Sequence, residues 1–245
     1  MKLHLSISRP LDSFLETVFP SQCVGCGGVV DSSSFSSVCE DCSNRFQLIE
    51  EPKCLTCGFP FYGEAESRTH CMHCEHLTPE FGQGWSIALF RGPLRELIYA
   101  LKYKDGFWAL RDIRVLAKSA TGLEEYIGEA SLVPVPLHPR KQRERGYNQS
   151  QLLVKELVSL FPRSRQSDLL ERSVDTVSQT QFDRKQRIRN LKNAFSLCRN
   201  RAIDPAQRYI IVDDVFTTGS TVNACSAVLR RAGARAVDVL TIGHG

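Results

Sequence analysis

From about residue 84 onward, the apolar positions of the chain follow two alternating periods. Short apolar runs typical of buried strands stand at residues 85–90, 132–135, 209–212 and 237–242. After the first run, residues 92–104 and 109–120 repeat apolar side chains at helical spacing. Strands that alternate with helices in this way predict an α/β domain with a mainly parallel sheet.

The chain before this point has a different character. Of the ten cysteines in the whole chain, eight lie between residues 23 and 74, in sequence rich in Gly and Ser. We therefore expect an N-terminal helical segment at residues 1–20, a cysteine-rich segment at 21–80 and the α/β domain at 81–245. With 245 residues, of which 42% are hydrophobic, the chain can form at least one substantial core, which excludes the disordered and fibrous classes.

The sequence predicts no transmembrane segment, because it contains no run of about eighteen apolar residues. Asp12 and Glu16 interrupt the apolar stretch that a signal peptide needs, so we expect a cytoplasmic protein. The net charge of +4 is uneven, with −6 on residues 1–80 and +10 on residues 81–245. The positive charge of the second part supports binding of a polyanion such as single-stranded DNA as one alternative; a solvated basic face is the other, because phosphate ligands alone account for several of these charges.

The clustered cysteines form four CxxC pairs. They are Cys23 and Cys26, Cys39 and Cys42, Cys54 and Cys57, and Cys71 and Cys74. Two CxxC knuckles complete the tetrahedral sulfur site that suits zinc. Because Gly follows both Cys26 and Cys57, the segment reads as a duplication, which favours sequential pairing and two zinc ions; a crossed, RING-like pairing is the alternative. With eight thiols present, we expect His70, His73 and His76 at the surface rather than as ligands.

We expect both zinc ions to be structural, because four thiolates leave no coordination position for a substrate. The segment has too little apolar sequence to fold without metal. A thioredoxin-like redox role needs one CxxC at a helix N-terminus, which four evenly spaced copies do not match. The acidic charge of the segment argues against nucleic-acid binding there. The lone Cys198 and Cys225 are expected in the core.

Chemically informative residues concentrate at residues 209–221. An apolar strand delivers Asp213 and Asp214 to the carboxyl edge of the sheet, where ligands bind in open α/β folds. A hydroxyl-rich loop then opens a helix; its residues are Thr217, Thr218, Gly219, Ser220 and Thr221. Backbone N–H groups, hydroxyls and the helix dipole converge there on a space the size of an anion. Two adjacent carboxylates can accept hydrogen bonds from two adjacent hydroxyl groups. The segment therefore predicts a pocket for a sugar that carries a terminal phosphate.

Two basic segments accompany this pocket. Residues 133–149 read as a strand end, a basic loop and the start of a helix, and Arg143 and Arg145 beside Gly146 suit pyrophosphate. Residues 172–195 carry basic residues about every three positions, among them Arg184 and Arg187, without a firm apolar period. We expect residues 173–190 to form a mobile lid over the site.

Residues 209–221 resemble the phosphoribosyl pyrophosphate (PRPP) binding motif of type I phosphoribosyltransferases. The match includes both acids together with Thr218, Gly219 and Thr221.

The order of motifs along the whole chain resembles the ComF/GntX family of bacterial competence-associated proteins. The cysteine pairs are followed by Leu-Lys-Tyr at 101–103, Arg-Gly-Tyr-Asn-Gln at 145–149, Arg187 with Asn190, and the PRPP-like motif. The resemblance covers nearly the full chain from Cys23 onward. It implies a type I phosphoribosyltransferase-like parallel sheet flanked by helices and preceded by a double zinc ribbon.

The resemblance also implies a function. In Mg²⁺-dependent phosphoribosyl transfer, Asp213 and Asp214 would hold the ribose, residues 217–221 the 5′-phosphate, and Arg143 and Arg145 the departing pyrophosphate. No residue stands out as a general base for an acceptor. The alternative is a non-catalytic competence factor that senses PRPP or binds single-stranded DNA during natural transformation, with other competence proteins as partners.

Departures from related motifs narrow these expectations. Thr217 stands where related purine-salvage enzymes carry an acid that holds the purine, which argues against hypoxanthine or guanine as the acceptor. The chain has no GxxxxGK[ST] motif, which excludes a P-loop ATPase. Tyr99, Tyr103 and Phe107 have helical spacing, which favours a buried stripe over a surface that stacks on bases.

Overall fold

The computed structural model describes residues 21–61, 71, 74, 77–173 and 194–245. Several sequence predictions fall outside the described residues: the helical segment 1–20, the histidines His70, His73 and His76, and the lid arginines Arg184 and Arg187.

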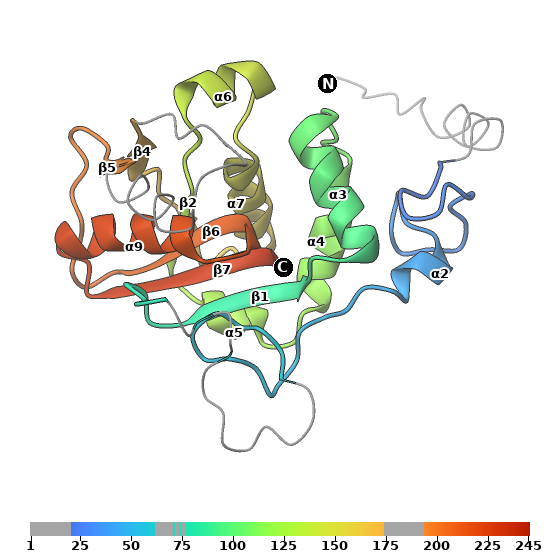
Figure 1. Ribbon diagram of the computed structural model, residues 1–245, viewed down its shortest axis with the longest axis horizontal. Helices are drawn as coiled ribbons and strands as arrows, with labels where there is room; N and C mark the ends of the chain where they lie inside the picture. The colour runs from blue at the N-terminus through green and yellow to red at the C-terminus, as the bar shows by residue number, and fades with distance from the viewer. Residues whose placement is uncertain (1–20, 62–70, 72–73, 75–76, 174–193) are drawn as a thin grey trace, which may run out of the picture.

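Five parallel strands form the central sheet, in the order β1-β7-β6-β2-β3 (Figure 1). They are β1 (Gly84–Leu89), β2 (Ser131–Pro134), β3 (Arg165–Gln166), β6 (Arg208–Phe216) and β7 (Ala236–His244). A separate antiparallel pair consists of β4 (Leu170–Arg172) and β5 (Phe195–Leu197). The predicted α/β class and its four predicted strands are confirmed.

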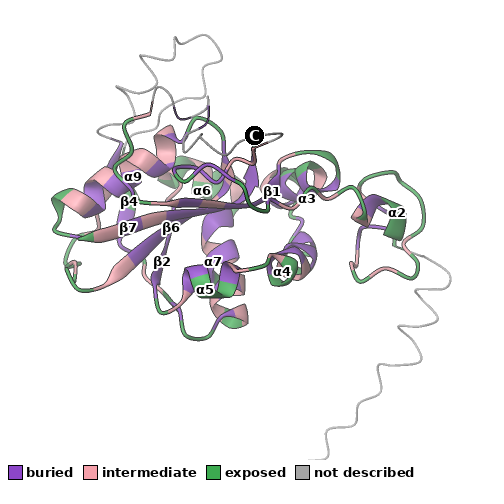
Figure 2. Cartoon of the chain, turned by 90° about the horizontal axis from the view of Figure 1, so that it is seen from below, coloured by how far each residue is buried: buried purple, intermediate pink, exposed green. Residues whose placement is uncertain are grey.

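Helices cover both faces of the sheet. The helices are α2 (Glu40–Ser43), α3 (Gly92–Tyr103), α4 (Ala109–Ser119), α5 (Leu123–Ile127), α6 (Pro139–Arg145), α7 (Gln149–Leu160) and α9 (Ser220–Arg231). One face carries α4, α5 and α7, and the other carries α9 and the β4–β5 pair (Figure 2). Within the described residues, no helix is both long and apolar enough to cross a bilayer.

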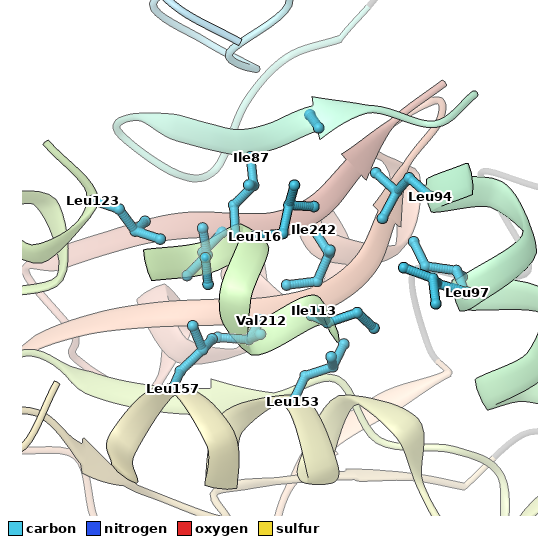
Figure 3. Packing of buried hydrophobic residues seen from close by; sticks show 14 of the residues in the cluster. Ile87, Leu94, Leu97, Ile113, Leu116, Leu123, Leu153, Leu157, Val212 and Ile242 are labelled. Carbon is cyan, nitrogen blue, oxygen red and sulfur yellow. The ribbon is translucent and has the colours of Figure 1, made fainter. Parts of the chain in front are cut away.

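Alternate side chains of the central strands face the two layers, as expected of a sheet that is buried on both sides. In β6, Ile210 and Val212 belong to the core on the α4 and α7 face, whereas Ile211 belongs to the core under α9. Figure 3 shows the first of these cores, where Leu116 of α4 and Leu153 of α7 approach the strands. Strand β6 is thus held from both sides, which fixes the position of the residues at its carboxyl end.

The two cysteine clusters pack against different parts of the α/β domain. Three of the first four cysteines belong to the core of α3 and α4, and the second four belong to the core under α9. Asp112 of α4 is fully buried and accepts hydrogen bonds from the backbone N–H groups of Ser36 (2.6 Å) and Ser37 (2.9 Å). The first ribbon is therefore anchored on α4, whereas the second lies on the opposite face of the sheet.

Candidate functional site

Strand β6 carries both predicted acids in its carboxyl-terminal half. The strand runs to Phe216, beyond the apolar run 209–212, because its ladder with β7 continues from Asp213 opposite Thr241 to Phe216 opposite His244. Asp213 is half-buried, and Asp214 is only 4% exposed. The acids therefore lie within a rigid strand rather than just beyond it.

Asp213 lies in a desolvated position beside a second carboxylate. Its Oδ1 accepts hydrogen bonds from the Ser150 hydroxyl and from the backbone N–H of Asp214, both at 3.0 Å. Desolvation and the adjacent charge of Asp214 nevertheless raise the pKa of Asp213 to about 7. The charge of Lys102 and the two hydrogen bonds lower the pKa of Asp213, but they do not offset the effect of burial.

Lys102 of α3 supplies one positive charge to the acid pair. Its Nζ lies 2.9 Å from Oδ2 of Asp214, and its side chain is 23% exposed. The carbonyl of the preceding residue, Leu101, accepts a hydrogen bond from the Tyr147 hydroxyl. Sequence reasoning noted the Leu-Lys-Tyr motif but assigned no role to this lysine, because nothing in the local pattern shows that α3 passes beside β6.

The loop 217–221 turns from β6 into α9. Gly219 caps the helix with φ of +69°, and a Cβ placed there would lie 2.5 Å from Cζ of Phe216, so only glycine fits. The Thr218 and Ser220 hydroxyl oxygens lie 2.9 Å apart, and the first two loop residues are exposed. The loop thus presents hydroxyls and the amino end of a twelve-residue helix at the carboxyl edge of the sheet.

The predicted basic loop contains a helix, α6, which corrects the sequence reading. Pro139 at its first turn and Gly146 (φ +82°) at its C-cap are ordinary signals for the start and end of a helix. The density of basic residues concealed these signals. In the last turn of α6, Arg143 is exposed and Arg145 is half-buried.

The segment between α6 and α7 connects the basic residues with the acids. Asn148 caps α7 by accepting a hydrogen bond from the backbone N–H of Ser150 (3.0 Å). Arg145 donates to Oε1 of Gln149. Because the neighbouring Ser150 holds Asp213, Arg145 contacts the same helix start that positions the acid pair.

An aromatic patch, defined as Tyr99, Tyr103, Phe107 and Trp108, lies on the surface. These side chains are 48%, 64%, 48% and 44% exposed, so the predicted buried stripe is wrong. Their helical spacing does select one face, but the leucines of α3 fill the core from the other face. The Tyr99 and Tyr103 rings lie 4.9 Å apart, and the Arg145 guanidinium lies 5.4 Å from the centre of the Tyr103 ring.

A cavity of about 510 Å³ runs beside this patch. Its lining residues are Phe90, Arg95, Glu96, Ile98, Tyr99, Lys102 and Tyr103. Because Lys102 also contacts Asp214, the cavity borders the acid pair.

Each cysteine cluster has the geometry of one zinc site. The four sulfur atoms of each set lie within 4.8 Å of one another. Cys26 and Cys39 are 3.7 Å apart at sulfur, Cys54 and Cys74 3.9 Å, and Cys57 and Cys71 3.4 Å. A tetrahedron with Zn–S bonds of about 2.3 Å has sulfurs about 3.8 Å apart. Both sites therefore fit structural zinc, and the sequential pairing is confirmed over the crossed one.

The two lone cysteines have different environments. Cys225 of α9 is fully buried, and its burial and the charge of Asp213 raise the pKa of its thiol. Cys198 is only half-buried, so the expectation that it lies in the core is wrong.

Sequence comparison places the chain among competence proteins. It is 31% identical over 225 residues to competence protein F of Haemophilus influenzae, covering 90% of this chain and 96% of that protein. It is 34% identical over 209 residues to DNA utilization protein YhgH of Escherichia coli, covering 82% and 88%. Competence protein ComFC of Streptococcus pneumoniae is 26% identical over 212 residues, covering 84% of this chain and 87% of the relative.

A family model and the solved structures add to this picture. The double zinc ribbon domain matches residues 14–75. A hypoxanthine phosphoribosyltransferase from Staphylococcus aureus aligns with 54% of this chain and 62% of its own, at 13% identity and a TM-score of 0.34. On the strength of the full-length match at 31% identity, together with the ribbon match, the chain belongs to the competence protein F family.

Proposed function

We propose that the acid pair of β6 and the loop 217–221 bind the ribose and the 5′-phosphate of PRPP. The observation that carries this proposal is the continuous strand, loop and helix that presents two carboxylates beside hydroxyls and a helix N-terminus. In this proposal Asp213 and Asp214 bind the ribose hydroxyls, and residues 217–221 bind the phosphate.

The pyrophosphate of PRPP would then lie toward α6. Arg143 and Arg145 of its last turn offer guanidinium groups suited to phosphate oxygens, and Gly146 leaves space beside them, since no atom lies within 4 Å of a Cβ placed there. Arg184 and Arg187 stay part of the proposal as lid residues.

Magnesium fits the same arrangement. The two adjacent carboxylates carry two formal negative charges, and the ammonium of Lys102 supplies one positive charge beside them, which supports a divalent cation at this place. Carboxylates together with phosphate oxygens are the ligands that Mg²⁺ prefers. Mg²⁺ would neutralise charge on the pyrophosphate as it departs, while the residues of the chain hold the sugar.

The cavity beside Lys102 is the proposed acceptor space. It adjoins the acid pair, and its walls combine aromatic rings with the charged Arg95 and Glu96. Those walls suit a planar, hydrogen-bonding group, such as a nucleobase.

Calorimetric titration with PRPP and Mg²⁺ tests the binding proposal. Asp213→Asn keeps the size of the side chain and removes its charge, so we expect affinity to fall about tenfold or more, as charge-assisted hydrogen bonds are worth about 1.5 to 3 kcal/mol. Asp168→Asn, the same change at an exposed acid of the same domain, is the matched control and should leave affinity unchanged. Equal affinities of wild type and Asp213→Asn would contradict the proposed ligand position.

Catalysis is tested separately, by the release of pyrophosphate from PRPP with a panel of nucleobases, amines and nucleic acids. Turnover with one acceptor class supports transfer. Tight PRPP binding without turnover on any acceptor would replace the enzyme proposal with that of a PRPP sensor.

A second candidate function, binding of single-stranded DNA, is favoured by the aromatic patch. Exposed rings beside cationic groups can stack on bases, and Lys104 lies 5.4 Å from the centre of the Tyr99 ring. The relatives are named for competence and DNA utilization, which agrees with this candidate.

Fluorescence anisotropy with a labelled oligothymidylate tests this second function. Tyr103→Ala should weaken binding by about 1–3 kcal/mol if a base stacks on the ring. Leu55→Ala, at an apolar ribbon residue of similar exposure (55%), is the control. Binding should also weaken steeply with salt. Affinity that is independent of salt, or equal in the two variants, would argue against this function.

A further inference from the structure

The second zinc ribbon lies directly against the loop 217–221. The geometry points to this ribbon as the element that holds the loop in its anion-binding shape, so that zinc at Cys54, Cys57, Cys71 and Cys74 sets the affinity for phosphate there. The consequence for binding rests on the proposed function of the loop. The structural coupling itself does not.

The first contact joins the end of the ribbon to the first turn of α9. Asn223 donates from Nδ2 to the carbonyl of Thr78 (2.9 Å), and its Oδ1 accepts from the backbone N–H of Glu80 (2.6 Å). The backbone N–H of Leu77 in turn donates to the carbonyl of Cys74 (2.9 Å). Three residues of chain therefore separate the zinc ligand Cys74 from Thr78, whose carbonyl binds Asn223 at the start of α9.

The second contact is steric. A Cβ on Gly219 would lie 3.1 Å from Cδ2 of Leu77 as well as close to Phe216, so the loop backbone is enclosed between the ribbon and the end of β6. Phe81 also packs edge-on against Phe216, with ring centres 6.5 Å apart. The left-handed turn at Gly219 is thus enclosed by Leu77 at the end of the ribbon and by Phe216 of β6.

The third contact approaches from the other knuckle of the ribbon. The backbone N–H of Cys54 donates to the carbonyl of Phe59 (2.8 Å), and the Phe59 ring lies 5.0 Å from the His244 ring. His244 stacks on Phe216, also at 5.0 Å between ring centres. The knuckle of Cys54 and Cys57 is therefore linked through Phe59 and His244 to Phe216, the residue before the loop.

Zinc is what keeps these contacts together. Four thiols converge within 4.8 Å in a segment with few apolar residues, and without metal their convergence has little to sustain it. The first ribbon is a natural control, because it has the same sulfur geometry but is anchored through Asp112 on α4.

Amide hydrogen exchange without any ligand tests the coupling. Cys74→Ser and Cys42→Ser each remove a buried ligand, one from each ribbon, and metal analysis should show that each variant loses one of two zinc ions. We expect exchange of the amides of residues 219–226 to accelerate at least about tenfold in Cys74→Ser and to stay at the wild-type rate in Cys42→Ser. Equal rates in the two variants would overturn the inference.

Asn223→Ala removes the hydrogen bonds between the end of the ribbon and α9 without removing a zinc ligand. Alanine is the best helix former, so any loosening of α9 would come from the lost hydrogen bonds to Thr78 and Glu80. We expect both zinc ions to be retained and exchange at residues 219–226 to accelerate. Affinity for PRPP with Mg²⁺ should fall about threefold to tenfold, which corresponds to the net contribution of about one hydrogen bond. Unchanged exchange in this variant would contradict the coupling.

The coupling and the proposed function can fail independently. If the wild type does not bind PRPP but the exchange pattern holds, the ligand is wrong and the coupling stands. If PRPP binds equally to the wild type and to Cys74→Ser, the ligand stands, and the inference that zinc at this ribbon sets the affinity of the loop is wrong.

Discussion

Asp213 and Asp214 are adjacent in the sequence but differ in electrostatic environment. Asp214 is buried and paired directly with Lys102, whereas Asp213 accepts hydrogen bonds from neutral donors, is repelled by Asp214 and receives a weaker attraction from Lys102. A sequence reading treats the two acids as equivalent ribose ligands. The structure predicts that neutralising one stabilises the fold and neutralising the other destabilises it.

For Asp213→Asn we expect higher thermal stability than the wild type at pH 8 and no difference near pH 4. The pKa of Asp213 is raised to about 7 in the folded protein, so its contribution to stability is fully present below the unfolded pKa of about 4 and is lost as pH rises through 7. Asparagine stays neutral and avoids that loss. Differential scanning calorimetry at several pH values checks this, and a stability difference that does not depend on pH would contradict the raised pKa.

For Asp214→Asn we expect the opposite sign. The change leaves the Lys102 ammonium, 23% exposed, without its partner at 2.9 Å, which should lower the free energy of unfolding by about 1–3 kcal/mol. Urea denaturation measures this loss. In the double variant Asp214→Asn with Lys102→Met, part of the lost free energy of unfolding should be recovered. If the losses of the two single variants simply add in the double variant, the two residues are not coupled.

At the level of elements, the sequence predicts the continuous segment of strand β6, the loop 217–221 and helix α9, because each of the three carries its own local signal. The apolar run, the acids, the single glycine and the helical period appear in that order within one segment. Two sequence predictions, the loop at α6 and the burial of the aromatic residues on α3, are wrong for physical reasons. In α6, the signals of Pro139 and Gly146 were outweighed by basic residues, and on α3 the aromatic period was assigned to the core although leucines occupy that side.

Gly219→Ala tests how tightly the loop is enclosed. We expect a loss of stability larger than that of Gly146→Ala, because both glycines have positive φ (+69° and +82°) but only the Cβ at 219 meets other atoms, at 2.5 Å. The left-handed conformation costs about 1–2 kcal/mol for either alanine, so the excess measures the steric contact. Chemical denaturation of both variants gives the difference, and equal losses would mean that the loop can move away from Phe216.

At the level of the whole molecule, the sequence predicted the two zinc sites but not their position on the sheet. The CxxC spacing specifies ligands locally, whereas the packing of Leu77 and Asn223 depends on contacts between distant parts of the chain. The pairing of Lys102 with Asp214 likewise depends on contacts between distant parts of the chain, so the sequence did not predict it. The division into segments 1–20, 21–80 and 81–245 stays a prediction.

Metal analysis of the intact protein should return two zinc ions per chain, both bound through the eight clustered cysteines. Cys23→Ser should lower the ratio to one and loosen only the first ribbon, since the two sulfur sets are separate. A ratio near one in the wild type, or the loss of both ions from Cys23→Ser, would contradict two independent sites.

The central claim concerns where an anionic sugar binds. A crystal structure of the protein with PRPP and Mg²⁺ should show the 5′-phosphate on the backbone N–H groups of the loop 217–221 and the ribose beside Asp213. The chain offers a rival anion site at the opposite edge of the sheet, a cavity of about 450 Å³ whose lining includes Arg163, Arg165 and Arg208. Ligand density in that arginine cavity, with none at the loop, would contradict the account.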